Sequence, residues 1–144
     1  MTIAHSLIGL VIGKKIGYTL PLIIGSIFPD IDHLFILIKN KHFRLHEAFK
    51  AMKNEDKAGE RYKTPYTHSI LAWIIFSAAA VLISKPAGLA FCLAYALHLL
   101  LDILDTDEKQ LFYPFKKTIR GFLPVLGKYE IIFAAILIII YFYI

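Results

Sequence analysis

The sequence has little charge and almost no cysteine. Charged residues make up 19% of the 144 residues, and Cys92 is the one cysteine, so a framework of intramolecular disulfides is excluded. The Gly-x-Gly-x-x-Gly, P-loop and Gly-x-Ser-x-Gly spacings are absent, and with them the usual signatures of dinucleotide, nucleotide and serine-hydrolase sites. The first residues lack a basic region and a small-residue cleavage site, so we expect no removed signal peptide.

Apolar residues are in excess. Hydrophobic residues make up 58% of the chain and the mean hydropathy is +0.62, whereas soluble domains average about 45–50% apolar residues. A chain this short cannot bury so much apolar surface in one soluble core. The composition therefore predicts a single membrane-embedded domain over residues 1–144. The net charge of +5 is typical of residues that flank membrane spans, and we expect membrane lipids and no nucleic acid as partners.

Four apolar regions cover residues 3–38, 70–84, 86–104 and 130–144. Only helices and closed barrels satisfy the backbone in lipid, and the alternating pattern of a barrel is missing. The pattern predicts a small all-α, polytopic membrane protein with about four to five helices. A full span needs about 20 residues. Within the first region, Lys14-Lys15 predicts a turn and Pro29 predicts the end of the second helix, which leaves two short helices that enter the bilayer partway.

If these helices alternate in direction, their ionisable residues reach the same face of the membrane. That face receives 13 of the 16 Lys and Arg, eight in residues 39–63 and five in residues 109–128, whereas the other face receives three. Because positive charge favours the cytoplasm, the sequence predicts a multi-pass protein in the cell membrane with its polar cluster on the cytoplasmic side. The cluster has seven members, His5, Asp30, Asp32, His33, His68, His98 and Asp102.

Ionisable residues inside apolar segments are costly and usually functional. His98 and Asp102 are four residues apart, so their side chains project from the same face of a helix. An imidazole nitrogen and a carboxylate oxygen are good donors to zinc, and this spacing lets both reach one ion. The alternative is a simple His–Asp hydrogen bond that orients the helix.

Residues 28–33, with the sequence Phe-Pro-Asp-Ile-Asp-His, contain three potential ligands in four positions. Pro29 predicts a helix end, and an Asp after it can cap the next helix. Capping accounts for one carboxylate but not for both Asp30 and Asp32 together with His33. We therefore expect metal binding or catalysis here.

Two further histidines lie where apolar helices begin. His68 stands between Thr67 and Ser69, either of which is a good N-cap for the helix that follows, and His5 lies near the start of the chain. Both histidines fit either a ligand or a helix-start role. The pair His42 and His46 also has helical spacing, but it lies in a highly charged stretch where exposed histidine is ordinary.

The motifs together resemble the LexA-regulated, membrane-bound, metal-dependent hydrolases, with a more distant similarity to the zinc-dependent phospholipases C. The resemblance is carried by His5, residues 25–33, residues 67–69, His98-Leu-Leu-Leu-Asp102 and residues 111–115. It implies a helical domain that holds one or more divalent metals, with zinc expected, and that activates water. The implied ligands are His5, Asp30, Asp32, His33, His68, His98 and Asp102.

The resemblance also implies chemistry for the site. Asp30 or Asp32 would bridge metals or act as a general base, and a site at headgroup depth favours a lipid phosphoester as the substrate. There is one departure. Members of the family usually have His-Arg-Gly before the residue that precedes Thr-His-Ser, whereas this chain has Lys63-Thr64-Pro65 at these positions. We expect His42 or His46, with Arg44 or Arg61, to replace the missing pair by folding over the site, unless a metal has been lost.

The rival interpretation is a non-enzymatic membrane protein that uses the same cluster as a structural or ion-binding metal site. A transporter normally has polar groups near the membrane midplane and repeated halves. Here the polar groups lie at the ends of the apolar segments and no repeat is visible, which favours the hydrolase. A structural site with four protein ligands remains an alternative, because such sites hold a metal without room for water.

Overall fold

The computed structural model describes residues 2–39, 41, 63–124 and 127–144, and in this part of the chain every regular element is a helix. The predicted all-α class is therefore confirmed for the described residues. The apolar regions predicted at residues 70–84, 86–104 and 130–144 each form one helix. In chain order the elements are α1 (Thr2–Ile16), α2 (Thr19–Ile27), the 3₁₀ turn η1 (Phe28–Asp30), α3 (Ile31–Lys39), α6 (Ile70–Ile83), α7 (Lys85–Asp102) and α8 (Lys128–Tyr143).

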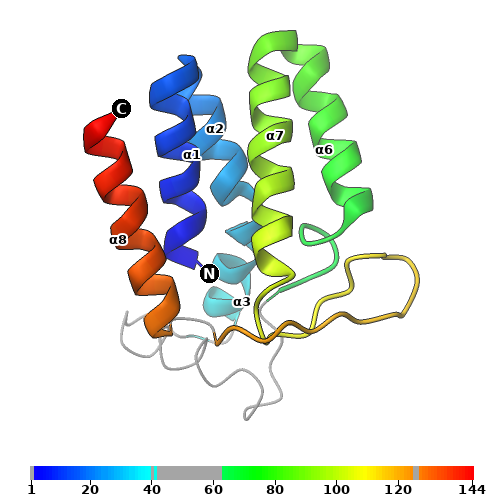
Figure 1. Ribbon diagram of the computed structural model, residues 1–144. Coiled ribbons are helices and arrows are strands. Elements are labelled where there is room, and N and C mark those ends of the chain that lie inside the picture. The colour runs from blue at the N-terminus through cyan, green and yellow to red at the C-terminus, as the bar shows by residue number, and fades with distance from the viewer. Residues whose placement is uncertain (1, 40, 42–62, 125–126) are drawn as a thin grey trace.

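The helices stand side by side in the order α8, α1, α2, α7, α6 (Figure 1). Helix α7 packs against α2 and α6, and α1 packs against α2 and α8. Successive helices alternate in direction, so α1 and α6 begin at the same end of the bundle where α3 and α7 finish (Figure 1). The end that carries these four termini, called the lower end below, is where the ionisable residues were predicted to meet.

The prediction that the second helix ends at Pro29 is confirmed for the α-helix, because α2 ends at Ile27. The chain does not turn there, however: η1 joins α2 to α3, and Thr19–Lys39 form one continuous apolar helical segment of 21 residues. Proline lacks the N–H that would continue the α-helical hydrogen bonding, and the chain responds with a single 3₁₀ turn. Both Phe28 and Ile31 keep right-handed helical dihedrals beside this turn, so the segment continues in the same direction.

Small residues allow α2 to approach both of its neighbours closely. A Cβ atom on Gly25 would lie 2.5 Å from the carbonyl oxygen of Phe91 in α7, and one on Gly9 of α1 would lie 2.7 Å from the carbonyl oxygen of Leu22. Helices that associate in lipid pack through such small residues because apolar burial drives them together only weakly there. The contact at Gly25 places the last turn of α2 against the middle of α7.

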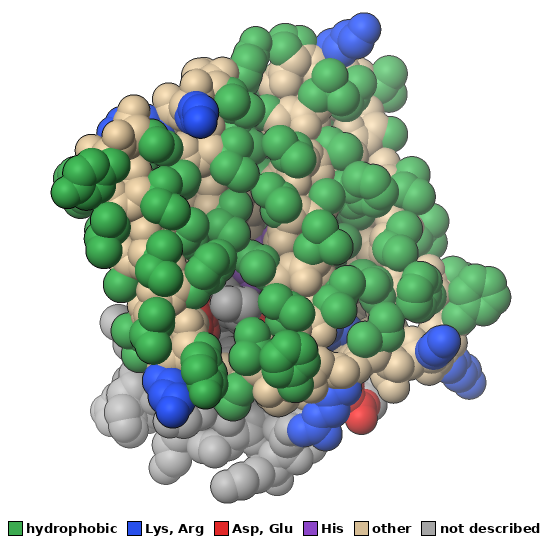
Figure 2. Space-filling view, viewed as in Figure 1, with side chains coloured by type: hydrophobic (Ala, Val, Ile, Leu, Met, Phe, Trp, Pro, Cys, Tyr) green, Lys and Arg blue, Asp and Glu red, His purple; other side chains and the backbone are tan. Residues whose placement is uncertain are grey.

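The outer surface of the bundle is strongly apolar. Figure 2 shows hydrophobic side chains over most of the visible face, with Lys and Arg near its two ends. Among the described residues, Thr19–Lys39 is the one helix that is both long and apolar enough to cross a membrane, and α6 is apolar but has 14 residues. One stripe of this long helix has side chains that are 46–68% exposed and spaced three or four apart: Leu20, Ile24, Ile27, Ile31, Leu34 and Ile38.

The lower end is closed by two irregular segments. Residues 103–124 form turns and two isolated bridges, Asp105 with Leu123 and Lys109 with Ile119. Residues 63–69 lead into α6, where Ser69 is the N-cap and its Oγ accepts a hydrogen bond from the N–H of Ala72. The predicted roles of His42, Arg44, His46 and Arg61 fall on residues outside the described part of the chain.

Candidate metal centre

The last turn of α7 presents His98 and Asp102 to the interior of the bundle. Both residues are buried, and His98 Nε2 lies 3.5 Å from Asp102 Oδ2, beyond hydrogen-bond range. The other ring nitrogen, Nδ1, donates to the carbonyl oxygen of Ser26 at 2.7 Å. A carbonyl can only accept, so Nδ1 carries a proton and Nε2 is the nitrogen that faces Asp102.

Asp32 orients His68 in the same way. Its Oδ2 accepts hydrogen bonds from the backbone N–H of Thr64 at 2.6 Å and from the hydroxyl of Thr67 at 2.9 Å. The same oxygen lies 3.0 Å from His68 Nδ1, so that nitrogen donates its proton and His68 Nε2 faces the interior. Hydrogen bonding of one imidazole nitrogen to a carboxylate, with the other left for an ion, is how metal sites orient histidine.

Asp30 faces both histidines. Its Oδ1 lies 3.6 Å from His68 Nε2 and 3.6 Å from His98 Nε2. The two nitrogens are 3.4 Å apart, and Asp102 Oδ2 lies 3.5 Å from each of them. Five of the distances among these four atoms, from Asp30, His68, His98 and Asp102, are therefore between 3.4 and 3.6 Å. We call these residues the four-donor group.

The four-donor group has the dimensions of a site for one divalent ion. The two imidazole nitrogens form a near-equilateral triangle with either carboxylate oxygen, with sides of 3.4–3.6 Å. A point about 2.1 Å from all three corners exists for such a triangle, which matches the distances of zinc to nitrogen and carboxylate oxygen. Asp102 Oδ2 is buried and has no hydrogen-bond partner among the described residues. A buried acceptor without a partner is costly, and a cation at such a point would remove that cost. The residues fit the metal that the sequence predicts.

His5 of α1 lies directly beside the four-donor group. Its ring centroid is 3.8 Å from that of His98, its Nδ1 is 3.7 Å from Asp30 Oδ2, and its Nε2 is 3.6 Å from Asp102 Oδ1. The side chain is buried, and neither ring nitrogen has a hydrogen-bond partner among the described residues. His5 thus faces the outer oxygens of the two carboxylates whose inner oxygens belong to the four-donor group.

His33 completes the set of predicted residues. Its Nδ1 lies 2.8 Å from Asp32 Oδ1 and 3.7 Å from Asp30 Oδ1, and its ring centroid is 5.5 Å from that of His68. All seven residues named by the sequence therefore converge at the lower end of the bundle. Five of them contact one another around one centre, whereas Asp32 and His33 form a hydrogen-bonded pair on its α3 side.

Lys63 is part of this cluster although sequence reasoning did not assign it a role. Its side chain is 4% exposed, and its Nζ lies 2.8 Å from Asp102 Oδ1, 3.1 Å from Asp105 Oδ2 and 3.5 Å from Asp107 Oδ2. Lys63 comes from the segment in which the chain departs from the His-Arg-Gly pattern. The signal that could have found it was its distance of five residues from His68.

Neighbouring charges set the protonation of the two cationic groups that lie outside the helices. Burial by itself lowers the pKa of His68, but the carboxylates of Asp30, Asp32 and Asp102 raise it to about 9. Burial also opposes the charge on Lys63, and the carboxylates of Asp102, Asp105 and Asp107 raise the pKa of that ammonium well above its ordinary value. Both groups are therefore protonated at neutral pH in the metal-free protein, and a metal on His68 Nε2 would displace its proton.

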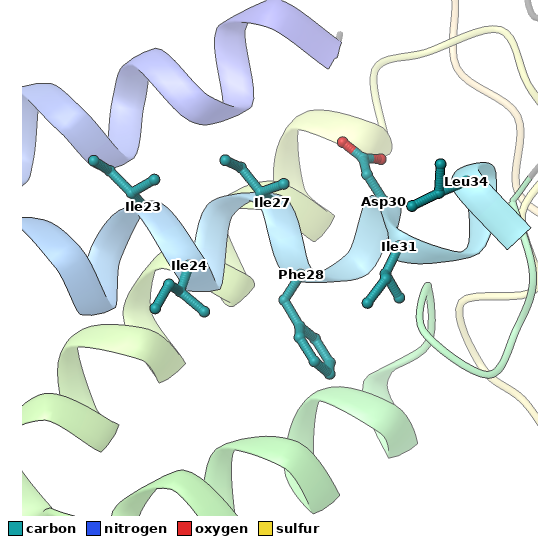
Figure 3. Close-up of a pocket in the computed structure, with 7 residues that line it drawn as sticks. All are labelled: Ile23, Ile24, Ile27, Phe28, Asp30, Ile31 and Leu34. Carbon is teal, nitrogen blue, oxygen red and sulfur yellow. The ribbon is translucent and has the colours of Figure 1, made fainter. Parts of the chain in front are cut away.

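An apolar surface cavity lies along the long helix, and Asp30 of the four-donor group is one of its lining residues. It has a volume of about 390 Å³, and six of its seven lining residues are apolar. Figure 3 shows Ile23, Ile27 and Asp30 extending toward the same side of the segment, with Asp30 farthest along toward α3. Asp30 is also the most exposed member of the four-donor group, at 14%. The lining residues are Ile23, Ile24, Ile27, Phe28, Asp30, Ile31 and Leu34.

The fold and the site together define a class: an all-helical protein with an apolar outer surface and a buried His–Asp centre at one end. Comparison with known families makes the identity more specific. The family model described as YdjM inner membrane protein matches residues 1–144, so the chain belongs to the YdjM inner membrane protein family. This membership fits the resemblance to the LexA-regulated membrane family and confirms a location in a cell membrane. No curated protein and no solved structure matches the chain.

Proposed function

We propose that this protein is a membrane-embedded, metal-dependent hydrolase that cleaves a phosphoester bond in a lipid. The observation that carries the proposal is the four-donor group. Five of the distances among its two imidazole nitrogens and two carboxylate oxygens are 3.4–3.6 Å. Two nitrogen and two oxygen donors at this spacing suit zinc. When bound, the ion supplies a Lewis acid and lowers the pKa of water toward about 7.

The residues around the donors have separate tasks. The Ser26 carbonyl and the Asp32 carboxylate hold the rings of His98 and His68 so that each Nε2 faces the ion position. Both oxygens of Asp32 are already engaged, Oδ2 by Thr64 and Thr67 and Oδ1 by His33. We therefore assign Asp32 a positioning role and Asp30 a ligand role, where the sequence alone had offered both as ligands or bases.

His5 is the proton acceptor in this proposal. A general base needs a free lone pair close to the reacting centre, and neither nitrogen of His5 has a hydrogen-bond partner among the described residues. A proton taken up at Nδ1 would face Asp30 Oδ2, 3.7 Å away, and one taken up at Nε2 would face Asp102 Oδ1, 3.6 Å away. Either carboxylate stabilises the imidazolium that forms.

The cavity favours a lipid as the substrate. Its lining includes four residues of the exposed stripe of the long helix, together with Asp30, which belongs to the four-donor group. An acyl chain can lie along Ile24, Ile27 and Ile31 while the phosphoester meets the polar centre. A water-soluble phosphoester would gain nothing from walls of this kind.

The distribution of charge supports a multi-pass topology with the centre on the cytoplasmic side. Lys14, Lys15 and Lys85 lie at the end of the bundle opposite the centre, whereas the other eight Lys and Arg of the described residues belong to the segments at the lower end. Cytoplasmic segments carry the excess of positive charge in membrane proteins. Helix α6, at about 21 Å, is shorter than the apolar core of a bilayer and requires local thinning.

A structural metal site is the second candidate, and one observation favours it. Four protein donors fill a tetrahedral zinc site completely, which is the usual composition of structural rather than catalytic zinc. The hydrolase is the better proposal because a structural site needs neither a neighbouring imidazole without hydrogen bonds nor a cavity that reaches one of its ligands. Zinc can also take a fifth ligand during a reaction.

Purified protein in lipid nanodiscs, loaded with zinc, tests the function. We expect hydrolysis of a phospholipid, loss of activity with a chelator, and recovery when zinc is added back. His5→Gln should retain one bound ion and lose about 10²–10⁴-fold in rate, the usual contribution of a general base. If the zinc-loaded protein hydrolysed neither phospholipids nor bis(4-nitrophenyl) phosphate, the structural metal site would become the better interpretation.

A cavity-filling variant tests the substrate class. Ile27→Trp should block the cavity and lower the rate on a phospholipid at least 10-fold, with little effect on bis(4-nitrophenyl) phosphate, which has no acyl chain. Ile74→Trp on the outer face of α6 is the control, because Ile74 is similarly exposed, 52% against 46% for Ile27, and does not line the cavity. Equal losses on both substrates would argue against a bound acyl chain.

Cysteine labelling tests the topology. In a Cys92→Ser background, Lys85→Cys and Lys117→Cys place one thiol at each end of the bundle, and both parent side chains are exposed. In whole cells, a membrane-impermeant reagent should modify the cysteine at position 85 and spare the one at position 117. The opposite labelling pattern would invert the proposed orientation.

A further inference from the structure

Lys63 has an unusual position for a lysine in an apolar bundle. Its ammonium group is surrounded by three carboxylates, Asp102, Asp105 and Asp107, at 2.8, 3.1 and 3.5 Å. Lysine is almost never fully buried unless it is paired. The backbone beside it is fixed as well, because the N–H of Thr64 donates to Asp32 at 2.6 Å. Lys63 is therefore held as part of the cluster and not as a surface side chain.

Asp102 uses its two oxygens for two different neighbours. Oδ2 faces His68 and His98 at 3.5 Å each and belongs to the four-donor group, whereas Oδ1 lies 2.8 Å from Lys63 Nζ. In two-metal hydrolases the ions lie about 3.5–4 Å apart, close enough for one carboxylate to contact both with separate oxygens. Asp102 has this bridging arrangement, with the four-donor group on one side and an ammonium on the other.

The surroundings of Lys63 also have the composition of a second cation site. Asp102 Oδ1, Asp105 Oδ2 and Asp107 Oδ2 all approach the same point, and His5 Nε2 lies 3.6 Å from Asp102 Oδ1. Carboxylate oxygens and an imidazole nitrogen are ordinary ligands of divalent metals. In this chain the ammonium of Lys63 takes the place that these groups would otherwise offer to an ion.

We propose that Lys63 replaces a second metal ion, so that the centre binds one divalent ion and carries a fixed ammonium as its second positive charge. The proposal rests on the proposed metal at the four-donor group. Its physical reason is that three buried carboxylates need a compensating cation. Because the ammonium belongs to the chain, it is present at every metal concentration, and it leaves no room for a second ion at Asp102 Oδ1.

The number of bound ions tests the proposal without any assay of activity. The full-length protein in nanodiscs is saturated with zinc, freed of excess metal and measured by elemental analysis. We expect one ion per chain in the wild type and in Lys63→Arg, which keeps the charge in place. Lys63→Gln should bind two ions, a two-fold increase, because the three carboxylates then face a neutral side chain.

Manganese provides a spectroscopic signature of where the second ion binds. Wild-type protein loaded with Mn²⁺ should give the EPR spectrum of an isolated ion, and Lys63→Gln should give the spectrum of an exchange-coupled pair, since Asp102 would then bridge the two. Lys109→Gln is the matched control. Lys109 is also buried, but its Nζ donates to the backbone carbonyl of Asp105 at 2.8 Å, so this variant should keep one ion.

Three results would overturn the proposal. Two ions in the wild type would show that Lys63 leaves the second site open, and this measurement needs no variant to fold. One ion in a folded Lys63→Gln protein would show that the carboxylates are not a latent metal site. Two ions in Lys109→Gln would show that net charge, and not the place of Lys63, limits binding. A wild type without any ion contradicts the proposed function itself, which keeps the two failures distinct.

Discussion

Helices α6 and α7 are neighbours of similar composition that have different tasks. Helix α7 lies between α2 and α6 and buries eight residues, among them His98 and Asp102. Helix α6 is at the end of the row, buries Ala72 and Ser77, and has no ionisable residue. Nearly all other side chains of α6 are at least partly exposed.

The difference shows where an apolar bundle can hold polar chemistry. An ionisable group in lipid is stable when other protein groups surround it. On α7, Ser26 and Asp30 approach His98 from the α2–η1 segment, and Lys63 approaches Asp102 from the segment before α6. A residue at the edge of the row has protein on one side alone. The central helix therefore carries the donors and the edge helix carries the apolar boundary.

The strongest test of this comparison removes a donor from the central helix. His98→Ala should lower the affinity for zinc at least 100-fold, since a lost ligand should cost no less than the 10–100-fold lost with an orienting group. Ser77→Ala, a buried polar substitution on α6, should leave the affinity unchanged. Zinc titration with a competing chelator measures both variants. An unaltered affinity in His98→Ala would return His98 and Asp102 to a purely structural hydrogen-bonding role.

A smaller loss is expected from the residue that orients His68. Asp32→Asn keeps the size of the side chain but removes the charge that accepts from His68 Nδ1 and Thr67 Oγ1. We expect zinc affinity to fall about 10–100-fold, the usual range for a group that holds a ligand in place. The same chelator titration applies. A loss larger than that of His98→Ala would mean that Asp32 itself contacts the metal.

The third prediction compares packing at the centre and at the edge. Gly25→Ala should reduce stability by about 1–3 kcal/mol, a typical cost of overpacking, because its new Cβ would lie 2.5 Å from the carbonyl oxygen of Phe91. Ala79→Leu on the exposed side of α6 should change stability by less than about 0.5 kcal/mol. Thermal unfolding in detergent reports both. If the edge variant were the more damaging one, α6 would need a partner on its outer face.

The smallest effect concerns two hydrogen bonds to backbone carbonyls. Tyr95 of α7 donates to the carbonyl of Thr67, and Trp73 of α6 donates to that of Cys92 at 3.0 Å. Tyr95→Phe should cost about 1 kcal/mol because it leaves a buried carbonyl without its donor. Trp73→Phe removes a half-buried bond, and its hydrogen-bond loss should be smaller. Comparing the unfolding free energies of Trp73→Phe and Trp73→Leu separates the hydrogen-bond loss from the packing of the ring. If the hydrogen bonds of Tyr95 and Trp73 proved to contribute equally, the distinction between centre and edge would be lost.

The candidate site was predictable to the extent that its residues interrupt apolar runs. His98 and Asp102 were identified by helical spacing alone, and Asp30 and His33 by three potential ligands in four positions. Alternating helix directions then required these residues to share one end. The different roles proposed for Asp30, as a ligand, and Asp32, as a positioning residue, could not be predicted. They depend on the hydrogen bonds that Asp32 accepts from Thr64 and Thr67, which are 32 and 35 residues away in the chain.

Two features could not be predicted from the sequence, for physical reasons. Helix α2 ends before Pro29 as predicted, but the 3₁₀ turn η1 continues the segment in the same direction into α3, which the loss of one backbone donor did not indicate. Lys63 escaped notice because lysine next to a polar stretch is normally solvated. Its role became visible once the fold brought Asp102, Asp105 and Asp107 around its ammonium.

The sequence by itself determined the all-α class, the place of three of the helices, the membrane location and the seven residues of the cluster, because each follows from hydropathy and from local spacing. The tertiary structure alone decided which four donor atoms lie within 3.4–3.6 Å of their neighbours, which carboxylate is engaged by Thr64 and Thr67, and where Lys63 lies. These depend on distances between atoms far apart in the chain, and hydropathy patterns carry no information about such distances. Helix packing sets them, through contacts as close as that of Gly25 with Phe91.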